Sequence, residues 1–161
     1  RWVFFALVLA GGSRSRPEAP PPRSLVCAPV PAAEPPSGRL ARADAFVVLT
    51  PEYNHSYPAP LKELIDGHFA EWQAKPVAFV SYGGISGGLR AVEHLRQVFA
   101  ELHAVSVRDT VSFHNAGALF DDRGRLGDPA AADAAVKTML DQLVWWGRAL
   151  REARNLRPYS G

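Results

Sequence analysis

The chain has 161 residues, of which 47% are hydrophobic and 21% charged, and its formal net charge is +2. This length suits one domain with a hydrophobic core. Lys and Arg form no long basic stripe, which argues against nucleic acid or a membrane surface as partner. The single cysteine, Cys27, excludes a disulfide framework or a multi-cysteine metal site within one chain.

The first apolar run covers residues 2–10, WVFFALVLA, between Arg1 and two glycines. This is the outline of a secretory signal, but we favour a buried helix or strand. The run is shorter than the roughly 20 residues that span a bilayer. Residues 11–38 are rich in Pro, Ser, Ala and Arg and predict a loop. Because so long a loop is unusual in a compact domain, a part is expected to be missing, replaced or disordered.

Three apolar segments rich in β-branched residues predict strands: residues 43–50, 76–82 and 105–113. Pro76 opens the second segment, where a missing N–H does no harm. The third segment is interrupted near Arg108 and Asp109, so it is expected to split there.

Apolar residues at helical spacing predict helices between and after the strands: residues 59–73, 87–104 and 130–156. Asp128 followed by Pro129 is a start signal for the last helix. Residues 114–129 predict a loop with an extra turn or hairpin. The alternation predicts an α/β sandwich with a parallel sheet, in a single domain whose first 40 residues are divergent.

Two loops at the carboxyl ends of predicted strands are unusual, and ligands of open parallel sheets bind at such ends. The first, TPEYNHSYPAPLK (50–62), is stiffened by prolines and offers the polar groups of Glu52 and Asn54 beside the aromatic ring of Tyr53 or Tyr57. The second, SYGGISGG (81–88), has four glycines, which allow the backbone and its N–H groups to approach a flat or anionic ligand. Together they predict a site for a planar heterocycle such as flavin.

A serine hydrolase is the competing interpretation, because residues 84–88 match G-x-S-x-G between a strand and a helix. The pattern is incomplete: His94 and His103 lie inside the predicted helix, and His114 precedes most candidate acids. No HGGG stretch, Walker pattern or HExxH motif occurs in the sequence, so neither a phosphate loop of that kind nor a metal site is predicted.

The stretch TPEYNHSYPAPLKELID, followed by KPVAFVSYGGISGGLRAVEHLRQVFAEL, closely resembles the NADPH-dependent FMN reductase family of flavodoxin-like proteins. The resemblance covers about residues 40–155. It implies a flavodoxin-like three-layer sandwich and eight residues around the isoalloxazine ring of FMN. Those expected to hold the ring are Pro51, Glu52, Tyr53 and Asn54. Those expected to line its other edge are Ser81, Tyr82, Gly83 and Gly84.

The resemblance also implies a function. FMN is expected to take a hydride from NADPH and pass electrons to an acceptor such as a quinone or free flavin, with no catalytic side chain required. A cytoplasmic homodimer or homotetramer is expected, without nucleic acid or membrane. The alternatives are an FMN-binding electron carrier and an inactive fragment of a family member.

Two alignments compete for the N-terminus. In one, FALVLAGGSRSR (5–16) is the family's first strand and phosphate loop, with Ser13, Arg14 and Arg16 on the FMN phosphate. In the other, residues 1–12 are the family's first helix, and the strand and phosphate loop are absent. We favour the helix, because a Trp near its start is common in the family. The N-terminal region is then incomplete, and FMN loses charge-assisted anchors.

Overall fold

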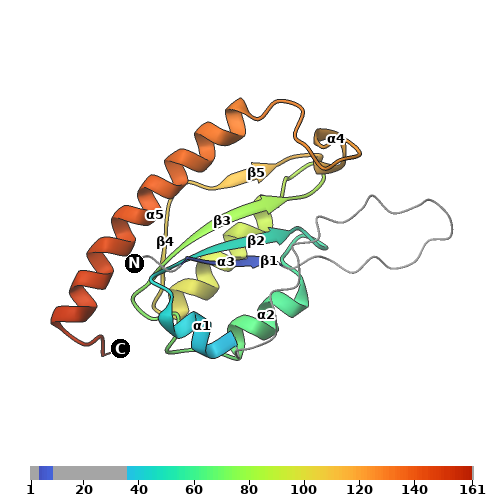
Figure 1. Cartoon of the computed structure of the whole chain (residues 1–161). Helices are drawn as coiled ribbons and strands as arrows, with labels where there is room; N and C mark the ends of the chain where they lie inside the picture. The colour runs from blue at the N-terminus through green and yellow to red at the C-terminus, as the bar shows by residue number, and fades with distance from the viewer. Residues whose placement is uncertain (1–3, 9–35, 161) are drawn as a thin grey trace.

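The structure is a computed structural model that describes residues 4–8 and 36–160 (Figure 1). Ser13, Arg14 and Cys27 therefore lie outside the described residues. In chain order the elements are β1 (Phe4–Val8), α1 (Pro36–Arg42), β2 (Ala45–Pro51), α2 (Ala59–Asp66), β3 (Pro76–Tyr82), α3 (Leu89–Glu101), β4 (Val105–Ser106), β5 (Val111–Phe113), α4 (Ala116–Leu119) and α5 (Ala130–Leu156).

The strands form one sheet in which every pairing is parallel, in the order β1-β2-β3, with β4 and β5 both on the far edge of β3. The third predicted strand is thus split, as expected, into two pieces that follow the same neighbour. Arg96 of α3 donates to the carbonyls of Val107 and Arg108 within the break, both at 2.8 Å. That side chain satisfies backbone groups that the ladder leaves unpaired.

The favoured helical interpretation of residues 1–12 is wrong. Residues 4–8 form β1 and pair with β2 in register from Phe4↔Ala45 to Val8↔Leu49. The physical reason is the edge of β2, whose backbone N–H and C=O groups need a strand beside them. The predicted loop over 11–38 is also wrong at its end, because α1 begins at Pro36, where a proline suits a first helical turn.

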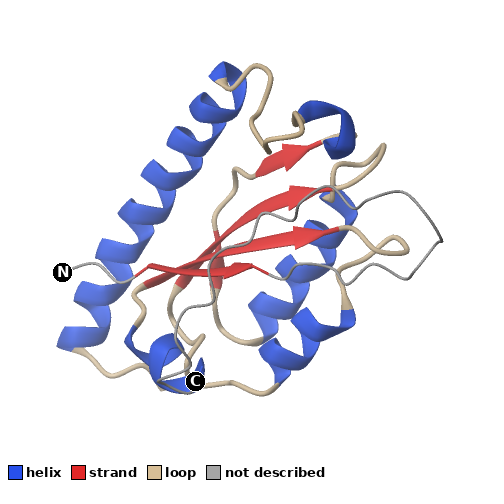
Figure 2. Ribbon diagram, turned by 45° about the vertical axis from the view of Figure 1, so that its right-hand side comes forward, coloured by secondary structure: helices blue, strands red, loops and turns tan. Residues whose placement is uncertain are grey.

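Helices cover both faces of the sheet (Figures 1 and 2), which confirms the expected α/β three-layer sandwich. On one face α1, α2 and α3 pack on a core that includes Phe46, Phe79 and Phe99. On the other face α5 packs with Met139 and Leu143. In the described part of the chain, no helix is both long and apolar enough to cross a membrane.

Two helices are shorter than predicted. α2 ends at Asp66 rather than at residue 73, and Gly67 follows it. Trp72 was expected on the apolar stripe of that helix but lies in the turn that follows it. Its side chain is still buried, and its Nε1–H donates to the carbonyl of Ile65 at 3.2 Å. α3 covers Leu89–Glu101 within the predicted 87–104, whereas α5 has its predicted bounds.

Lys75, a buried residue just before β3, connects the amino end of the sheet to α1 through hydrogen bonds. The Nζ of Lys75 donates to the carbonyls of Leu40 and Ala41 in the last turn of α1, at 2.9 and 2.8 Å. The residue is 6% exposed. Burial, with the nearby charge of Arg154, lowers the pKa of Lys75 to about 8, against the opposite influence of carboxylates.

We expect the protein to gain stability as the pH rises from about 8 to 10. Unfolded, Lys75 keeps its proton to about pH 10.4, whereas the folded chain releases it near 8, so the unfolded state binds more protons in this window. The gain is on the order of 2 kcal/mol, measured as urea unfolding free energies across the range. Lys75→Met should remove most of this rise, and an unchanged rise would assign it to other groups.

Candidate functional site

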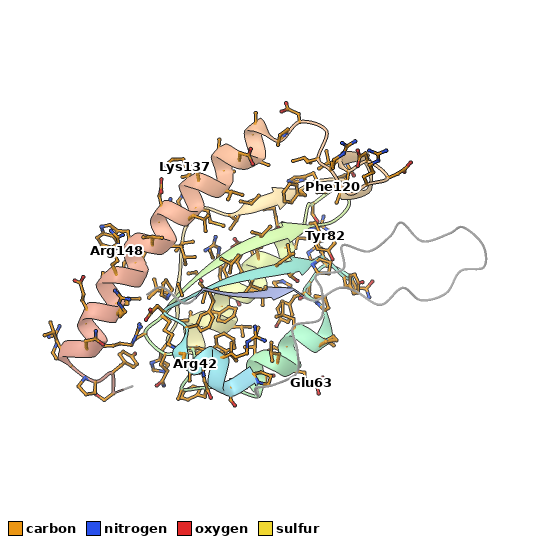
Figure 3. The ribbon with its side chains drawn as sticks, viewed as in Figure 1. Arg42, Glu63, Tyr82, Phe120, Lys137 and Arg148 are labelled. Atoms are coloured by element: carbon orange, nitrogen blue, oxygen red, sulfur yellow. The ribbon has the colours of Figure 1, made fainter. Side chains whose placement is uncertain are left out.

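The two unusual loops leave the sheet side by side. β2 and β3 pair with Thr50 opposite Ser81 and Pro51 opposite Tyr82, so both loops start from the same edge. The N–H of Glu52 extends this pairing by donating to the carbonyl of Tyr82 at 3.0 Å. Figure 3 shows Tyr82 at this edge, where β3 ends. The adjacency predicted from the sequence is therefore present.

The first loop is a tight turn over Tyr53–Ser56. The backbones of these two residues exchange hydrogen bonds of 2.8 and 3.0 Å. Between them Asn54 and His55 have φ of 48° and 73°, the left-handed pair that a type I′ turn requires. Asn tolerates this conformation best among non-glycine residues. Ser56 also hydrogen-bonds Nδ1 of His94 in α3 at 2.8 Å, and the turn leaves Tyr53 and Asn54 exposed.

The second loop folds back on the end of β3. Gly87 and Gly88 have φ of 61° and 87°, and a Cβ at Gly88 would lie 2.5 Å from the Cβ of Ser81. The buried hydroxyl of Ser81 donates to the carbonyl of Gly87 at 2.9 Å, and that of Ser112 donates to the same oxygen at 2.7 Å. These glycines are needed by the backbone. Gly84 is different, since a Cβ there would meet nothing within 4 Å.

A carboxylate joins the two loops. Glu52 accepts hydrogen bonds from the hydroxyl of Ser86 (2.5 Å) and from Nη1 and the backbone N–H of Arg90 (3.0 and 3.3 Å). Its side chain is 8% exposed. Burial would raise the pKa of Glu52, but the Ser86 hydrogen bond and the Arg90 charge outweigh it and hold the pKa below its usual range. The backbone N–H groups at the start of α3 were expected to face a ligand. One of them, that of Arg90, instead donates to Glu52.

A third segment, which the sequence reasoning missed, completes the edge. The backbone N–H groups of Asn115 and Ala116 donate to the carbonyls of Gly84 and Gly83 at 2.8 and 3.1 Å. Residues 82–84 and residues 115–118 line an open hollow of ≈ 480 Å³, which we call the loop hollow. Its lining is Tyr82, Gly83, Gly84, Asn115, Ala116, Gly117 and Ala118. The sequence signal that could have identified this segment is the run of small residues at 115–118, which follows β5 at the same edge of the sheet.

The rim of the loop hollow offers aromatic surface and backbone donors. Burial, and then the neighbouring Tyr53, raise the pKa of Tyr82, so its phenol stays protonated at neutral pH. Within the described residues, the N–H groups of Gly84 and Ile85 donate to no backbone or side-chain acceptor. Such groups on a glycine loop are suited to the acceptor atoms of a flat ligand.

The geometry does not support a serine hydrolase. Ser86 donates to Glu52 instead of a histidine. The downstream histidines have other partners in the described structure: His94 bonds Ser56, His103 bonds Tyr159 and His114 bonds the carbonyl of Ile85. The described residues also contain no group of three or more His, Cys, Asp or Glu side chains placed to hold a metal ion.

Comparisons with known proteins agree on one family. The sequence profile described as NADPH-dependent FMN reductase matches residues 16–118. An NADPH:quinone oxidoreductase of Arabidopsis thaliana is 34% identical over 108 residues, 63% of this chain and 55% of that protein. An NAD(P)H-dependent FMN reductase of Pseudomonas aeruginosa is 35% identical over 120 residues, 70% of this chain and 64% of that one. The match spans about half the length of most of the first such relatives.

Among solved structures, FerB of Paracoccus denitrificans, a flavoenzyme NAD(P)H:(acceptor) oxidoreductase, matches with a TM-score of 0.54 and 23% identity. The match covers 69% of this chain and 65% of that one. At this identity the likeness shows the fold alone, and it agrees with the parallel sheet and the two helical layers.

Proposed function

Because the chain belongs to the NADPH-dependent FMN reductase family, we propose that it is an FMN-dependent oxidoreductase that passes electrons from NADPH to a small acceptor such as a quinone or free flavin. The observation that carries the proposal is the loop hollow, which residues 82–84 of the second predicted loop and residues 115–118 line at the carboxyl edge of the sheet, where the first predicted loop also starts. In parallel sheets this edge is the usual ligand site.

The residues around the loop hollow fit a flavin ring. Gly84 leaves room for a flat group to lie against the backbone, and the N–H groups of Gly84 and Ile85 suit ring oxygens and nitrogens. Tyr53 and Tyr82 offer aromatic faces, and Asn54 offers an amide. These residues, with Gly83, are proposed to contact the ring.

Three of the predicted site residues are proposed to act by holding the loops. Pro51 and Ser81 are buried, and the carboxylate of Glu52 is engaged by Ser86 and Arg90. They position the residues that face the hollow. Ser13 and Arg14, outside the described residues, stay assigned to the FMN phosphate by the family resemblance alone.

When bound, FMN supplies the redox chemistry, accepting a hydride from NADPH and passing electrons on. The chain's own residues orient the ring and limit access to it. The raised pKa of Tyr82 keeps its hydroxyl protonated, so it adds no negative charge beside the ring. From the family resemblance we also propose a cytoplasmic homodimer or homotetramer.

An anaerobic spectrum tests the function. The purified chain is mixed with FMN, the bound flavin is separated from the free flavin, and NADPH is added under argon. The proposal expects the absorption of the bound flavin to bleach, and to return when a quinone is added. Binding without bleaching would instead identify an electron carrier. Failure to hold FMN at micromolar concentration would identify an inactive fragment.

Gly84→Ala tests the position of the ring. The new methyl has open space in the structure and needs no unusual backbone, so the variant should fold normally. It should nonetheless weaken FMN binding about tenfold or more, because the methyl occupies the place of the ring. Fluorescence titration of FMN measures this. Gly127→Ala, whose Cβ would only touch the carbonyl of Leu119 at 3.8 Å, is the matched control and should bind like the original chain.

A further inference from the structure

The segment that follows β5 holds the second loop by its carbonyls. Figure 1 shows β5 beside β3, with α4 directly after it, so this segment lies next to the loop that leaves β3. Three consecutive residues of the segment donate to three consecutive carbonyls of the loop. The bonds run from the N–H of Ala116 to Gly83 (3.1 Å), from the N–H of Asn115 to Gly84 (2.8 Å) and from Nδ1 of His114 to Ile85 (3.0 Å).

Holding these carbonyls also orients the N–H groups of the loop. A trans peptide is planar, and its C=O and N–H point in opposite directions. No cis peptide bond occurs in the described residues. The three held carbonyls therefore turn the next three N–H groups, those of Gly84, Ile85 and Ser86, away from the segment. Within the described residues these N–H groups donate to no acceptor. We call them the donor row.

His114 supplies the one side chain among the three holding bonds. The other two come from backbone N–H groups, which a substitution leaves in place. A carbonyl only accepts hydrogen bonds, so Nδ1 of His114 carries a proton. The ring also packs on the loop, because a Cβ at Gly87 would lie 2.7 and 2.8 Å from two of its carbons. His114 does not line the loop hollow, so it acts on a ligand through the loop.

We propose that His114 is a positioning residue for the flavin, which holds the carbonyl of Ile85 so that the donor row meets acceptor atoms of the FMN ring. This role rests on the proposed function, because FMN is the ligand that the donor row meets. The ring gains negative charge on reduction, and N–H groups fixed beforehand stabilise that charge without reorganising. Loss of the His114 bond should therefore weaken the binding of reduced FMN more than that of oxidised FMN.

Two substitutions test the role of His114, and both should fold normally because the residue is exposed. His114→Leu has no donor and should weaken the binding of oxidised FMN about fivefold, the effect of one hydrogen bond, in a fluorescence titration. His114→Asn carries an amide N–H near the place of Nδ1 and should bind within about twofold of the original chain. The reduction potential of bound FMN should fall in His114→Leu and recover in His114→Asn. A loss of fold stability alone would not move that potential.

His68→Leu is the matched control. Nδ1 of His68 also donates to a backbone carbonyl, that of Leu64 at 2.8 Å. This bond lies at the end of α2, and neither residue lines the loop hollow. The variant removes the same kind of bond elsewhere in the chain, so it should leave both the FMN affinity and the reduction potential unchanged.

Nitrogen-15 NMR of the chain without FMN tests the His114 contact by itself. At about pH 8.5, where histidine side chains are ordinarily neutral, the ring should carry its proton on Nδ1. The His114 signals are those missing from the spectrum of His114→Asn. A proton on Nε2 would overturn the proposal. If the original chain binds FMN and His114→Leu binds it equally well, the positioning role alone is wrong. If the original chain holds no FMN, the proposed function fails and this role fails with it.

Discussion

Gly88→Ala is expected to destabilise the fold by about 3 kcal/mol or more and to abolish FMN binding. The backbone at Gly88 has φ of 87°, a left-handed conformation that an alanine adopts with strain. The new Cβ would also lie 2.5 Å from the Cβ and 2.9 Å from the hydroxyl of Ser81. Ser81 is buried and its hydroxyl is bonded to the carbonyl of Gly87, so it has no room to yield. Urea unfolding and FMN titration measure the two effects.

The comparison with Gly84→Ala separates loop geometry from ring contact. At Gly84 the same methyl meets nothing, so only ligand binding should suffer there, whereas Gly88→Ala should lose stability as well. Adding Ser81→Gly to Gly88→Ala removes the colliding side chain but keeps the strained backbone, and should restore part of the stability. An unfolding midpoint for Gly88→Ala equal to that of the original chain would refute the packing described for this loop.

The sequence was informative about the site wherever the relevant residues follow one another along the chain. Strand ends in a parallel sheet meet at one edge, so residues 50–62 and 81–88 were expected to lie together, as they do. Local signals also located the break near Arg108 and the start of α5, where Asp128 accepts a hydrogen bond from the N–H of Ala130 at 3.1 Å.

Features that depend on distant residues were missed. The partners of Glu52 lie 34 and 38 residues along the chain, and no periodicity connects them. Residues 2–10 are apolar throughout, so their pattern cannot separate helix from strand. Residues 4–8 form a strand because they pair with the edge of β2, a distant segment that the local pattern does not reveal. Trp72 has helical spacing to Ile65, yet Gly67 ends the helix between them.

Glu52→Ala is the second change expected to have a large effect, although Glu52 is not among the residues that line the loop hollow. The variant removes the acceptor for the Ser86 hydroxyl, the Arg90 guanidinium and the Arg90 backbone N–H. Hydrogen bonds to a charged group each contribute about 1.5–3 kcal/mol, and part is recovered by water since the Arg90 side chain is 42% exposed. We expect a loss of about 2 kcal/mol in unfolding free energy and weaker FMN binding.

Glu52→Gln is the matched control, since it keeps the shape and one acceptor oxygen but lacks the charge. The pKa of Glu52 is lower in the folded chain than in the unfolded one, so its stabilising contribution is present above the unfolded pKa. That contribution is lost as the pH falls through the lowered folded value. The original chain should therefore lose stability in acid more steeply than Glu52→Gln, in urea unfolding at several pH values below 6.

FMN affinity then decides between two roles for Glu52. If Glu52 only positions the loops, Glu52→Gln should bind FMN more tightly than Glu52→Ala, and Arg90→Gln should weaken FMN binding to a similar degree as Glu52→Gln. The effects of Glu52→Gln and Arg90→Gln should also not add, because both remove the same ion pair. Additive losses would mean that the carboxylate contacts the ring itself, and Glu52 would then belong to the flavin-binding surface.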